Sequence, residues 1–294
     1  MIWLDGKKLA GKQADQLRQR ATNLLHKKIT PTLAVILVGD NPASKIYVHN
    51  KQKLCAEIGV NCKIIQLPAT IAAKAIKDKI ILLNNDKNIH GIILQLPLPD
   101  KLNANELIAY ISPSKDVDGL HPLNIGLLAS GEGIFIPATP KGILSLFKEY
   151  KISIVGKNVV IVGYGAVAGA PLSMLLAKAK ATVVIAQDKT KGLNKLTKSA
   201  DIVISAVGKP GLITGSMIKV GAVVVDVGIT KKGKNWVGDI DTKTVAKKAA
   251  CLTPVPGGVG PLTVSALLSN VILAAELSGR PASSATRNIS GRGA

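Results

Sequence analysis

The chain of 294 residues is poor in aromatic residues, in cysteine and in acidic residues, and each shortage restricts what it can be. With only two Trp, four Tyr and two Phe, aliphatic side chains must fill the core, and that composition suits buried parallel strands. Cys55, Cys62 and Cys251 form no CxxC pair and leave an odd number. The cysteines therefore exclude a disulfide framework and indicate a reducing, cytoplasmic compartment.

Signatures of metal sites, nucleotide loops and membrane spans are also missing. None of the Gly-Lys pairs is followed by Ser or Thr, which excludes a Walker A loop. The start lacks the apolar core of a signal peptide, and no apolar run approaches the roughly 18 residues of a spanning helix, so no membrane partner is expected. No metal is expected either, because HExxH spacing is absent from the four histidines, His26, His49, His90 and His121.

The scarcity of acids leaves 38 basic against 18 acidic residues and a net charge of +20. Such an excess favours anionic partners. Nucleic acid is disfavoured as the main partner, because the lysines are scattered and few aromatic residues lie among them for bases to stack on. Solvation of the surface and attraction of a small anionic substrate remain as the two explanations.

Length and hydrophobic patterning predict an α/β protein of two domains, because single cores stop growing near roughly 250–300 residues. Short apolar runs alternate with helical patterns along the chain. The first series predicts a parallel sheet with right-handed crossovers. It consists of strands at 32–38, 63–67 and 91–96, with helices at 41–59 and 71–84.

The pattern breaks between Lys115 and Thr139, where Asp, Gly, Pro and His are concentrated, and we place the domain crossing there. A helix is expected to begin with Thr139 as its N-cap and Pro140 as its first residue. A second βα series follows, with strands near 158–163, 181–187, 202–207 and 221–228. An apolar helix is predicted over 262–279, and the Ser/Gly/Arg-rich stretch 281–294 is predicted to be a disordered tail.

The segment Gly163-Tyr164-Gly165-Ala-Val-Ala168 follows a strand and precedes a helical pattern, as a dinucleotide-binding turn requires. Gly163 would allow the tight turn, and Gly165 would let backbone amides approach a pyrophosphate. Asp188, 25 residues after Gly163, could accept hydrogen bonds from the ribose hydroxyls. The alternative is a glycine turn that only packs helix on strand, with Asp188 as a solvated cap.

Candidate catalytic residues occur in the first half of the chain. Tyr47 and Lys51 are four residues apart on a predicted helix, so both can act on one ligand, although such a pair also suits an ordinary surface. Gln95 ends a strand before Leu-Pro-Leu-Pro, which equally suits a strand exit. Asp116 and Asp118 flank the crossing, with turn chemistry as the alternative. His121 is interpreted as a structural turn residue.

Thr253-Pro-Val-Pro-Gly-Gly-Val-Gly-Pro-Leu-Thr263 leads into the last predicted helix. Its prolines fix the path of the chain, and its glycines can admit a ligand against bare backbone.

The ordered motifs resemble the bifunctional methylenetetrahydrofolate dehydrogenase/methenyltetrahydrofolate cyclohydrolase family over about residues 1–280. They are Gly39-Asp-Asn-Pro-Ala-Ser-x-x-Tyr47-x-x-x-Lys51, Gln95-Leu-Pro-Leu-Pro, Lys115-Asp-Val-Asp-Gly-x-His-Pro, Thr139-Pro-x-Gly, Asp226-Val-Gly-Ile and Pro254-Val-Pro-Gly-Gly-Val-Gly-Pro. The resemblance implies a three-layer α/β catalytic domain over 1–138, completed by a helix over 264–280, and a Rossmann-like cofactor domain over 139–263. It also implies a folate cleft and a homodimer.

Residue roles follow from the same resemblance. Lys51 would be the main catalytic group, Tyr47 would pack on the folate rings, Gln95 would orient Lys51, and Asp118 would anchor the pterin. Pro256, Gly257 and Gly258 would wall the substrate pocket. The cofactor would be bound by Gly163, Tyr164, Gly165, Asp188 and Ile229.

Departures from the family lie in the cofactor half. The usual Gly-Arg-Ser is Gly163-Tyr164-Gly165, the usual His-Ser pair is Gln187-Asp188, and a usual Cys is Ala138. The cofactor is therefore NAD or NADP, and Asp188 favours NAD because it would confront the 2′-phosphate of NADP. The expected reactions oxidise 5,10-methylenetetrahydrofolate and hydrolyse the methenyl product to 10-formyltetrahydrofolate. Alternatives are a relative with one of the two activities and a non-catalytic basic folate- or nucleic-acid-binding protein.

Overall fold

The computed structural model describes residues 1–233 and 235–279, so the predicted tail at 281–294 lies outside the described residues. The chain forms two compact units. Residues 1–11 and 139–263 form one, which we call the six-stranded unit; residues 12–138 and the chain from Val264 form the other, the three-stranded unit. The sequence had assigned residues 1–11 to the same domain as 12–138. They belong instead to the six-stranded unit, because strand β1 (Ile2–Trp3) pairs with β11 (Cys251–Leu252).

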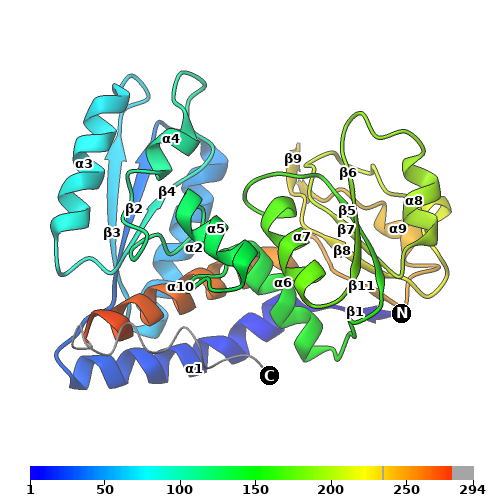
Figure 1. Ribbon diagram of the computed structural model, residues 1–294, viewed down its shortest axis with the longest axis horizontal. Coiled ribbons are helices and arrows are strands. Elements are labelled where there is room, and N and C mark those ends of the chain that lie inside the picture. Colours follow the sequence, from blue (N-terminus) through cyan, green and yellow to red (C-terminus); the bar gives the residue numbers. More distant parts are fainter. Residues whose placement is uncertain (234, 280–294) are drawn as a thin grey trace. The chain divides into compact units, whose positions relative to one another are not determined.

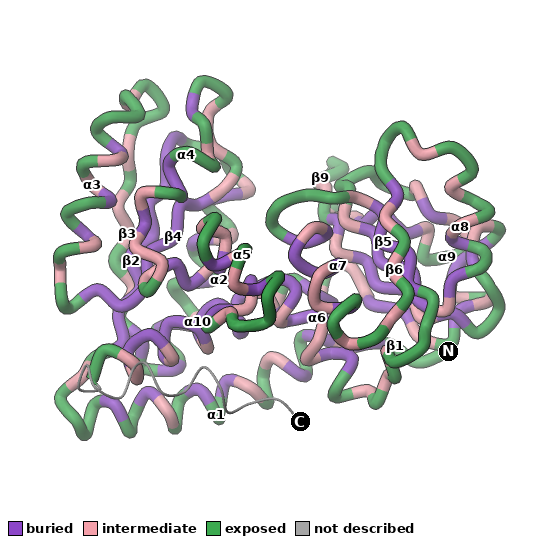
Figure 2. The backbone as a smooth tube through the Cα atoms, viewed as in Figure 1, coloured by how far each residue is buried: buried purple, intermediate pink, exposed green. Residues whose placement is uncertain are grey.

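The three-stranded unit has a parallel sheet in the order β3 (Asn61–Leu67), β2 (Thr32–Val38) and β4 (Gly91–Leu94). Every residue of β2 is buried, as expected for a central strand covered on both faces (Figure 2). Leu33, Val35 and Leu37 pack on one face of the sheet, and Ala34, Ile36 and Val38 pack on the other. This alternation makes the unit a three-layer α/β sandwich.

Helices cover both faces of this sheet (Figure 1). One face is covered by α2 (Pro42–Ile58), α10 (Val259–Ser278) and the later turns of α1 (Gly6–His26), and the other by α3 (Ala73–Asn85) and α4 (Ala104–Ile108). Arg20 of α1 makes a two-pronged ion pair with Glu276 of α10 at 2.9 Å for each hydrogen bond. A further helix, α5 (Pro122–Ser130), lies within the stretch read from sequence as a crossing.

Helix α10 is the one helix in the described part of the chain whose length and composition would suit a membrane span. The expectation that no run approaches that length is therefore wrong for this segment. The apolar composition of α10 reflects its place in the protein core, because Leu267, Leu268 and Val271 pack in the core of the three-stranded unit. In its most apolar window, 67% of the helix is buried inside the protein.

The six-stranded unit has a sheet in the order β1-β11-β8-β7-β5-β6, and all its strand pairs are parallel. The remaining strands are β5 (Asn158–Val162), β6 (Thr182–Ala186), β7 (Ile202–Ser205) and β8 (Val223–Asp226). Strand β5 lies between β6 and β7. The chain therefore continues from β5 to β6 on one side and then crosses back to β7 on the other side. That reversal is where Rossmann-like sheets bind their ligands.

Helices also form layers on both faces of this second sheet (Figure 1). Residues of α6 (Ala138–Glu149) and α7 (Gly169–Lys178) pack on one face. The other face packs against residues around α8 (Leu193–Ser199), the 3-10 turn Gly215–Met217 and α9 (Thr242–Val245). An antiparallel pair, β9 (Thr230–Lys232) and β10 (Asn235–Val237), lies outside the sheet. Helix α6 begins at Ala138, one residue before the predicted N-cap Thr139, so Thr139 lies in its first turn.

Candidate active site

Lys51 and Gln95 form the centre of the candidate site in the three-stranded unit. Lys51 Nζ donates a 2.8 Å hydrogen bond to Gln95 Oε1, and both side chains are buried, with exposed fractions of 9% and 8%. Gln95 follows β4, and its own amide nitrogen donates to the Leu96 carbonyl at 2.7 Å. This second bond orients the amide so that its oxygen faces Lys51. The two prolines after Gln95 end the strand here, as their sequence predicts.

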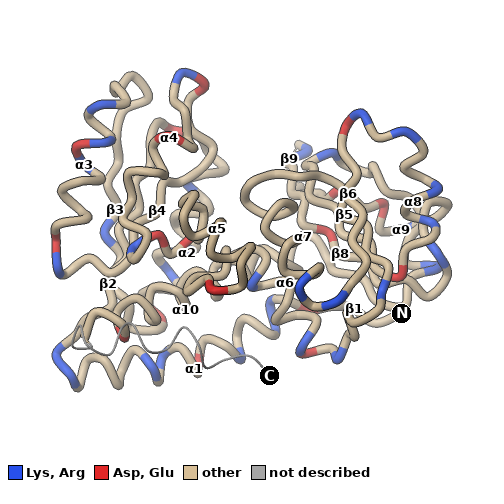
Figure 3. The backbone as a smooth tube through the Cα atoms, in the orientation of Figure 1, with Lys and Arg blue, Asp and Glu red and all other residues tan. Residues whose placement is uncertain are grey.

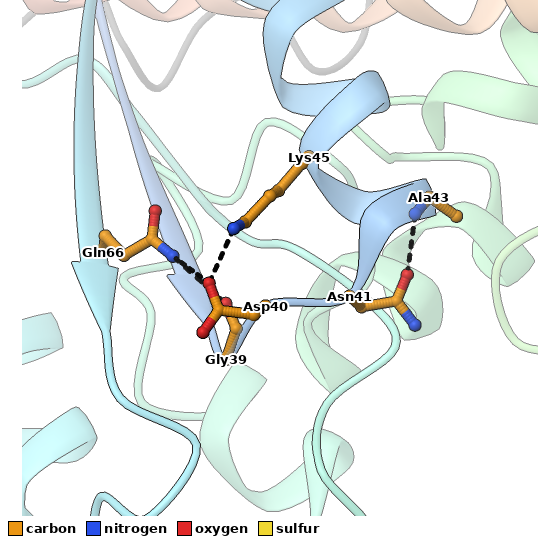
Figure 4. A network of polar contacts seen from close by, with 6 residues as sticks. All are labelled: Gly39, Asp40, Asn41, Ala43, Lys45 and Gln66. Atoms are coloured by element: carbon orange, nitrogen blue, oxygen red, sulfur yellow. Dashed lines mark hydrogen bonds and ion pairs between the residues drawn. The ribbon is translucent and has the colours of Figure 1, made fainter.

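A polar network fixes the start of α2, the helix that carries Lys51 (Figure 4). Asn41 Oδ1 accepts hydrogen bonds from the backbone N–H groups of Ala43 and Ser44 at 2.9 and 3.1 Å. Asp40 pairs with Lys45 at 2.7 Å and accepts a hydrogen bond from Gln66 of β3 at 3.3 Å. These contacts satisfy free donors at the N-terminus and tie it to the sheet. The network therefore fixes the orientation of the helix face that carries Tyr47 and Lys51.

Tyr47 lies four residues before Lys51 on α2, on the same side of the helix, as its spacing predicts. It is half-buried, and burial raises the pKa of its phenol. A neutral phenol ring with an exposed part can stack on a planar ligand and donate one hydrogen bond.

Asp118 supplies an acidic group to the same site. Burial lowers the pKa of Lys51, while the charge of Asp118 opposes that change. Burial likewise raises the pKa of Asp118; Lys51 opposes this rise and Asp116 adds to it. Lys51 and Asp118 are therefore electrostatically coupled, and burial biases both the amine and the carboxyl toward their neutral forms.

Asp116 and His121 serve the local fold instead. Asp116 is 1% exposed, and its carboxylate accepts hydrogen bonds from Leu120 N, His121 N and Asn124 Nδ2 at 3.2, 2.8 and 2.7 Å. His121 is the N-cap of α5, where its Nδ1 accepts from Leu123 N at 3.0 Å. Of the two acids in Asp116-Val-Asp118, the first thus shapes the turn, and the second remains for a ligand.

The glycine turn predicted to bind a dinucleotide lies at the carboxyl end of β5. Gly163 has φ +102°, and a Cβ there would lie 2.6 Å from the Ala206 carbonyl oxygen, so glycine is required. Gly165 is exposed, with open space where a side chain would be. Helix α7 begins only at Gly169, whose Cβ position would clash with the Gly163 carbonyl. The turn therefore offers bare backbone next to a helix N-terminus, which fits a pyrophosphate.

The other predicted cofactor residues surround the same end of the sheet. Tyr164 and Ile229 are exposed by 45% and 37%, and Ile229 follows β8. Asp188 lies two residues beyond β6, its side chain is 81% exposed, and its carboxylate lies 3.8 Å from Lys189 Nζ. Asp188 is thus available to a ligand, and the nearby charge of Lys189 partly neutralises its carboxylate.

Pro256, Gly257 and Gly258 belong to the six-stranded unit and lead directly into α10. Gly257 has φ +107°, and its carbonyl accepts a hydrogen bond from Lys7 N at 2.8 Å. Gly258 packs tightly, because a Cβ there would lie 2.6 Å from the Pro254 carbonyl oxygen. These glycines serve close backbone packing, while the exposed Pro256 is the member that a ligand can contact.

Two buried acids in the six-stranded unit were given no role from the sequence: Asp226 was named only as part of a motif, and Asp239 was missed. Asp239 is fully buried and accepts hydrogen bonds from Ser205 Oγ, Val207 N and Lys209 N at 2.8, 2.8 and 2.7 Å. Asp226 in turn accepts from Asp239 N at 2.9 Å, and burial raises the pKa of Asp226 to about 7. Together they hold the loop after β7, which contacts Gly163 through Ala206. Glycine is a sequence signal for this packing, because side chains at Gly228 and Gly238 would clash with these carboxylates.

Comparisons with known proteins agree with this arrangement. Residues 4–118 match the catalytic domain of tetrahydrofolate dehydrogenase/cyclohydrolase, and residues 137–279 match its NAD(P)-binding domain. The bifunctional protein FolD of Halalkalibacterium halodurans is 46% identical over 275 residues, covering 94% of this chain and 99% of that protein.

Two solved structures have the same fold. The bifunctional FolD dehydrogenase/cyclohydrolase of Campylobacter jejuni superimposes with a TM-score of 0.91 at 43% identity, covering 94% of this chain and 99% of that one. The FolD enzyme of Trypanosoma brucei, complexed with NADP and an inhibitor, gives a TM-score of 0.92 at 35% identity, covering 96% and 99%.

Proposed function

The chain belongs to the tetrahydrofolate dehydrogenase/cyclohydrolase family, and from this premise we propose that its three-stranded unit binds the folate and its six-stranded unit the nicotinamide nucleotide. The protein is a bifunctional enzyme of one-carbon metabolism. It oxidises 5,10-methylenetetrahydrofolate to the methenyl form and hydrolyses that product to 10-formyltetrahydrofolate. The changed cofactor loop left open whether the chain keeps one activity or both. The bifunctional relatives support both activities.

Lys51 is the proposed proton carrier. The methenyl carbon bears a positive charge, and water that adds to it must lose a proton. The C–N5 bond then breaks, and N5 gains a proton. An amine near its usual pKa of about 10.4 would be almost fully protonated at neutral pH. Because burial lowers the pKa of Lys51, a larger share of its amine is neutral and able to accept the proton.

Gln95, Asp118 and Tyr47 are proposed to position this chemistry. Gln95 holds Nζ through its 2.8 Å hydrogen bond, so the lone pair of a neutral Lys51 is aimed rather than free to rotate. Asp118 is proposed to bind the N–H donors of the pterin, for which a carboxylate is the natural acceptor. Tyr47 is proposed to stack on the rings.

The cofactor is proposed to bind with its pyrophosphate on Gly163 and Gly165, and with Tyr164 and Ile229 along its path. The backbone there fits such a group, since Gly165 is open and Gly163 tolerates no side chain. When bound, the nicotinamide supplies the hydride acceptor for the dehydrogenase reaction. Asp188 is proposed to meet the adenosine ribose and to favour NAD over NADP.

We also infer that the enzyme works as a cytoplasmic homodimer. The three cysteines are all free thiols, as a reducing compartment requires. The dimer is inferred from the family resemblance and is checked by sedimentation of the purified protein.

The observation that carries the proposed function is the buried Lys51–Gln95 hydrogen bond, and Lys51→Met tests it. The substitution keeps the length of the side chain but removes the amine. Cyclohydrolase activity should fall by at least roughly 10²-fold, the lower end of what general acid–base catalysis contributes. The matched control is Lys53→Met on the same helix, since Lys53 is exposed and lies outside the network that fixes the start of the helix.

Folate binding by Lys51→Met, measured by fluorescence titration, should remain within a few-fold of wild type. Full hydrolysis of methenyltetrahydrofolate by Lys51→Met would refute the assignment. Equal loss in Lys53→Met would show that disturbance of α2, rather than loss of the Lys51 amine, explains the effect.

A further inference from the structure

Two thiols, one buried and one half-buried, lie near Lys51, and nothing in the proposed mechanism uses them. Cys55 lies four residues after Lys51 on α2, so its side chain projects from the same face of the helix. Cys62 lies on β3 and packs against the same core cluster as Cys55. The stripe Tyr47, Lys51, Cys55 on one helix is therefore extended by a second sulfur from the sheet.

The turn between α2 and β3 brings the two cysteines together. Gly59 ends the helix in the left-handed conformation with φ +80°, and Val60 N donates to the Cys55 carbonyl at 2.9 Å. The chain then reverses into β3, where Cys62 pairs in register with Leu33 of β2. The turn thus brings both cysteines to the same core cluster, close enough for a thiol–thiol hydrogen bond that shifts the pKa of each.

The two thiols differ in accessibility. Cys55 is 1% exposed. Cys62 is only half-buried, because β3 pairs with β2 alone among the described strands and so forms an edge of the sheet. A reagent from solution therefore meets Cys62 first.

They differ in reactivity in the same direction. The hydrogen bond from Cys55 lowers the pKa of Cys62, and the charge of Lys51 lowers it further against the effect of burial. The same hydrogen bond, together with burial, raises the pKa of Cys55. Because the thiolate is the nucleophile, the more accessible sulfur is also the more reactive one.

We propose that Cys55 and Cys62 are a redox-active dithiol beside Lys51, which a low-molecular-weight disulfide such as oxidised glutathione converts into an intramolecular disulfide. The Cys62 thiolate attacks one sulfur of the reagent, forming a mixed disulfide and releasing one thiolate. Cys55 gives its proton to that thiolate and attacks the Cys62 sulfur, releasing the second thiolate, which takes up the proton lost by Cys62. Two protein thiols are oxidised, and one disulfide is reduced to two thiols.

The order of attack explains why the second step can follow. Cys55 has a raised pKa partly because it donates to the Cys62 sulfur as that sulfur becomes a thiolate. Once Cys62 carries the mixed disulfide, it has no negative charge to hold that proton. Cys55 then loses its proton more readily and can attack the mixed disulfide on Cys62.

A peptide map of protein oxidised with glutathione disulfide tests the pair directly. In a Cys251→Ser background, the titratable thiols of the unfolded chain should fall from two to none, without a bound glutathione. Cleavage after Glu57 separates the two cysteines, so the fragments should stay joined until a reductant is added.

Single variants identify the order of attack. Cys55→Ala should retain a glutathione adduct on Cys62, and Cys62→Ser should leave Cys55 as a free thiol. A wild-type chain that keeps both thiols free, or that stops at the glutathione adduct, would overturn the proposal. In the chain without the Cys251→Ser change, Cys251 of the other unit is the internal control and should form no intramolecular bond.

A pH–rate profile links the dithiol to Lys51, and this second readout rests on the proposed role of Lys51. The Cys62 thiolate favours the protonated form of Lys51, so its conversion to a neutral disulfide should lower the pKa of Lys51. The acidic limb of cyclohydrolase activity should move to lower pH on oxidation, return with dithiothreitol, and stay fixed in Cys62→Ser. An unmoved profile with the disulfide formed would overturn the link to Lys51. An active Lys51→Met enzyme would instead refute the proposed function and leave the peptide map as the test of the dithiol.

Discussion

Lys51 Nζ lies 2.8 Å from the amide oxygen of Gln95, and this hydrogen bond joins a helix to the end of a parallel strand. A neutral amide is the only described side chain that accepts a hydrogen bond from the amine. An amide oxygen holds the amine in place without adding a full charge beside it. Burial can therefore lower the pKa of Lys51 while the side chain stays oriented.

The identity of residue 95 should consequently set the pH dependence of the cyclohydrolase. In Gln95→Glu a carboxylate would replace the amide oxygen and raise the pKa of Lys51 by at least about one unit. Because the neutral amine is the active form, the acidic limb of the pH–rate profile should move to higher pH. Gln95→Leu is the opposing variant. It removes the hydrogen-bond acceptor that stabilises the protonated amine, so burial should lower the pKa of Lys51 further and move the acidic limb to lower pH. Equal profiles in the two variants would contradict the role of Lys51 as a base.

Alanine substitutions of Asp116 and Asp118 should affect different properties, stability and folate binding respectively, although the two residues are only two positions apart. Asp118→Ala should weaken folate binding by about 1–3 kcal/mol, the usual cost of an unsatisfied buried donor. Its thermal stability and nicotinamide binding should change little. Titration of each ligand separates these outcomes, and equal weakening of both ligands would assign Asp118 to the fold.

Asp116→Ala should act on stability instead. The change leaves the backbone N–H groups of Leu120 and His121 without this acceptor, and Asn124 keeps only its hydrogen bond to the Pro113 carbonyl. The free energy of unfolding should therefore fall by at least about 2 kcal/mol. Thermal melts of both variants make the comparison. A normal melting temperature for Asp116→Ala would show that the turn around Leu120 and His121 does not depend on this carboxylate.

Local patterns were sufficient to predict much of the three-stranded unit. The helix of Tyr47 and Lys51 has its own start and stop signals, Asn41 and Gly59, and the structure uses both as caps. Four-residue spacing then fixes a common face. Gln95 could be found because the prolines that follow it end a strand. Each of these signals lies within a few residues of the feature that it predicts.

Features that depend on distant pairing could not be predicted in this way. Residues 1–11 join the six-stranded unit because β1 pairs with β11, about 250 residues away, and neither two-residue strand carries a pattern. Nothing in Asp116-Val-Asp118 shows which acid is used up by backbone donors. The bond between Asp239 and the loop after β7 likewise spans more than 30 residues.

Asp226 should make the stability of the protein depend on pH. Burial raises the pKa of Asp226 from 3.8 to about 7 in the folded state. Between these values the unfolded chain has lost the proton and the folded chain has kept it, so the free energy of unfolding falls as pH rises and levels off above the folded pKa. The Asp226 carboxyl should lower the free energy of unfolding by up to about 1.4 kcal/mol for each pH unit in this range.

Urea unfolding at several pH values checks this linkage. Asp226→Asn cannot titrate, and it should flatten the decline between about pH 5 and 7 relative to wild type. Its absolute stability should be lower, because an amide NH₂ would face one of the two backbone donors, Asp239 N or Ile240 N. The exposed Asp188→Asn is the control and should keep the wild-type slope. An unchanged slope in Asp226→Asn would show that the carboxyl is ionised throughout.

Asp188 should set the choice of nicotinamide nucleotide. Its carboxylate can accept hydrogen bonds from the ribose hydroxyls of NAD but would repel the 2′-phosphate of NADP. Exposure and the nearby Lys189 weaken that repulsion, so we expect a preference for NAD on the order of tenfold, larger at low salt. Asp188→Ser should shift the ratio of kcat/KM values toward NADP. Lys189→Met separates the two charges: it should strengthen the preference for NAD, because the carboxylate loses its neutralising partner. A wild-type enzyme that prefers NADP, and loses that preference in Lys189→Met, would instead identify the lysine as the phosphate-binding residue.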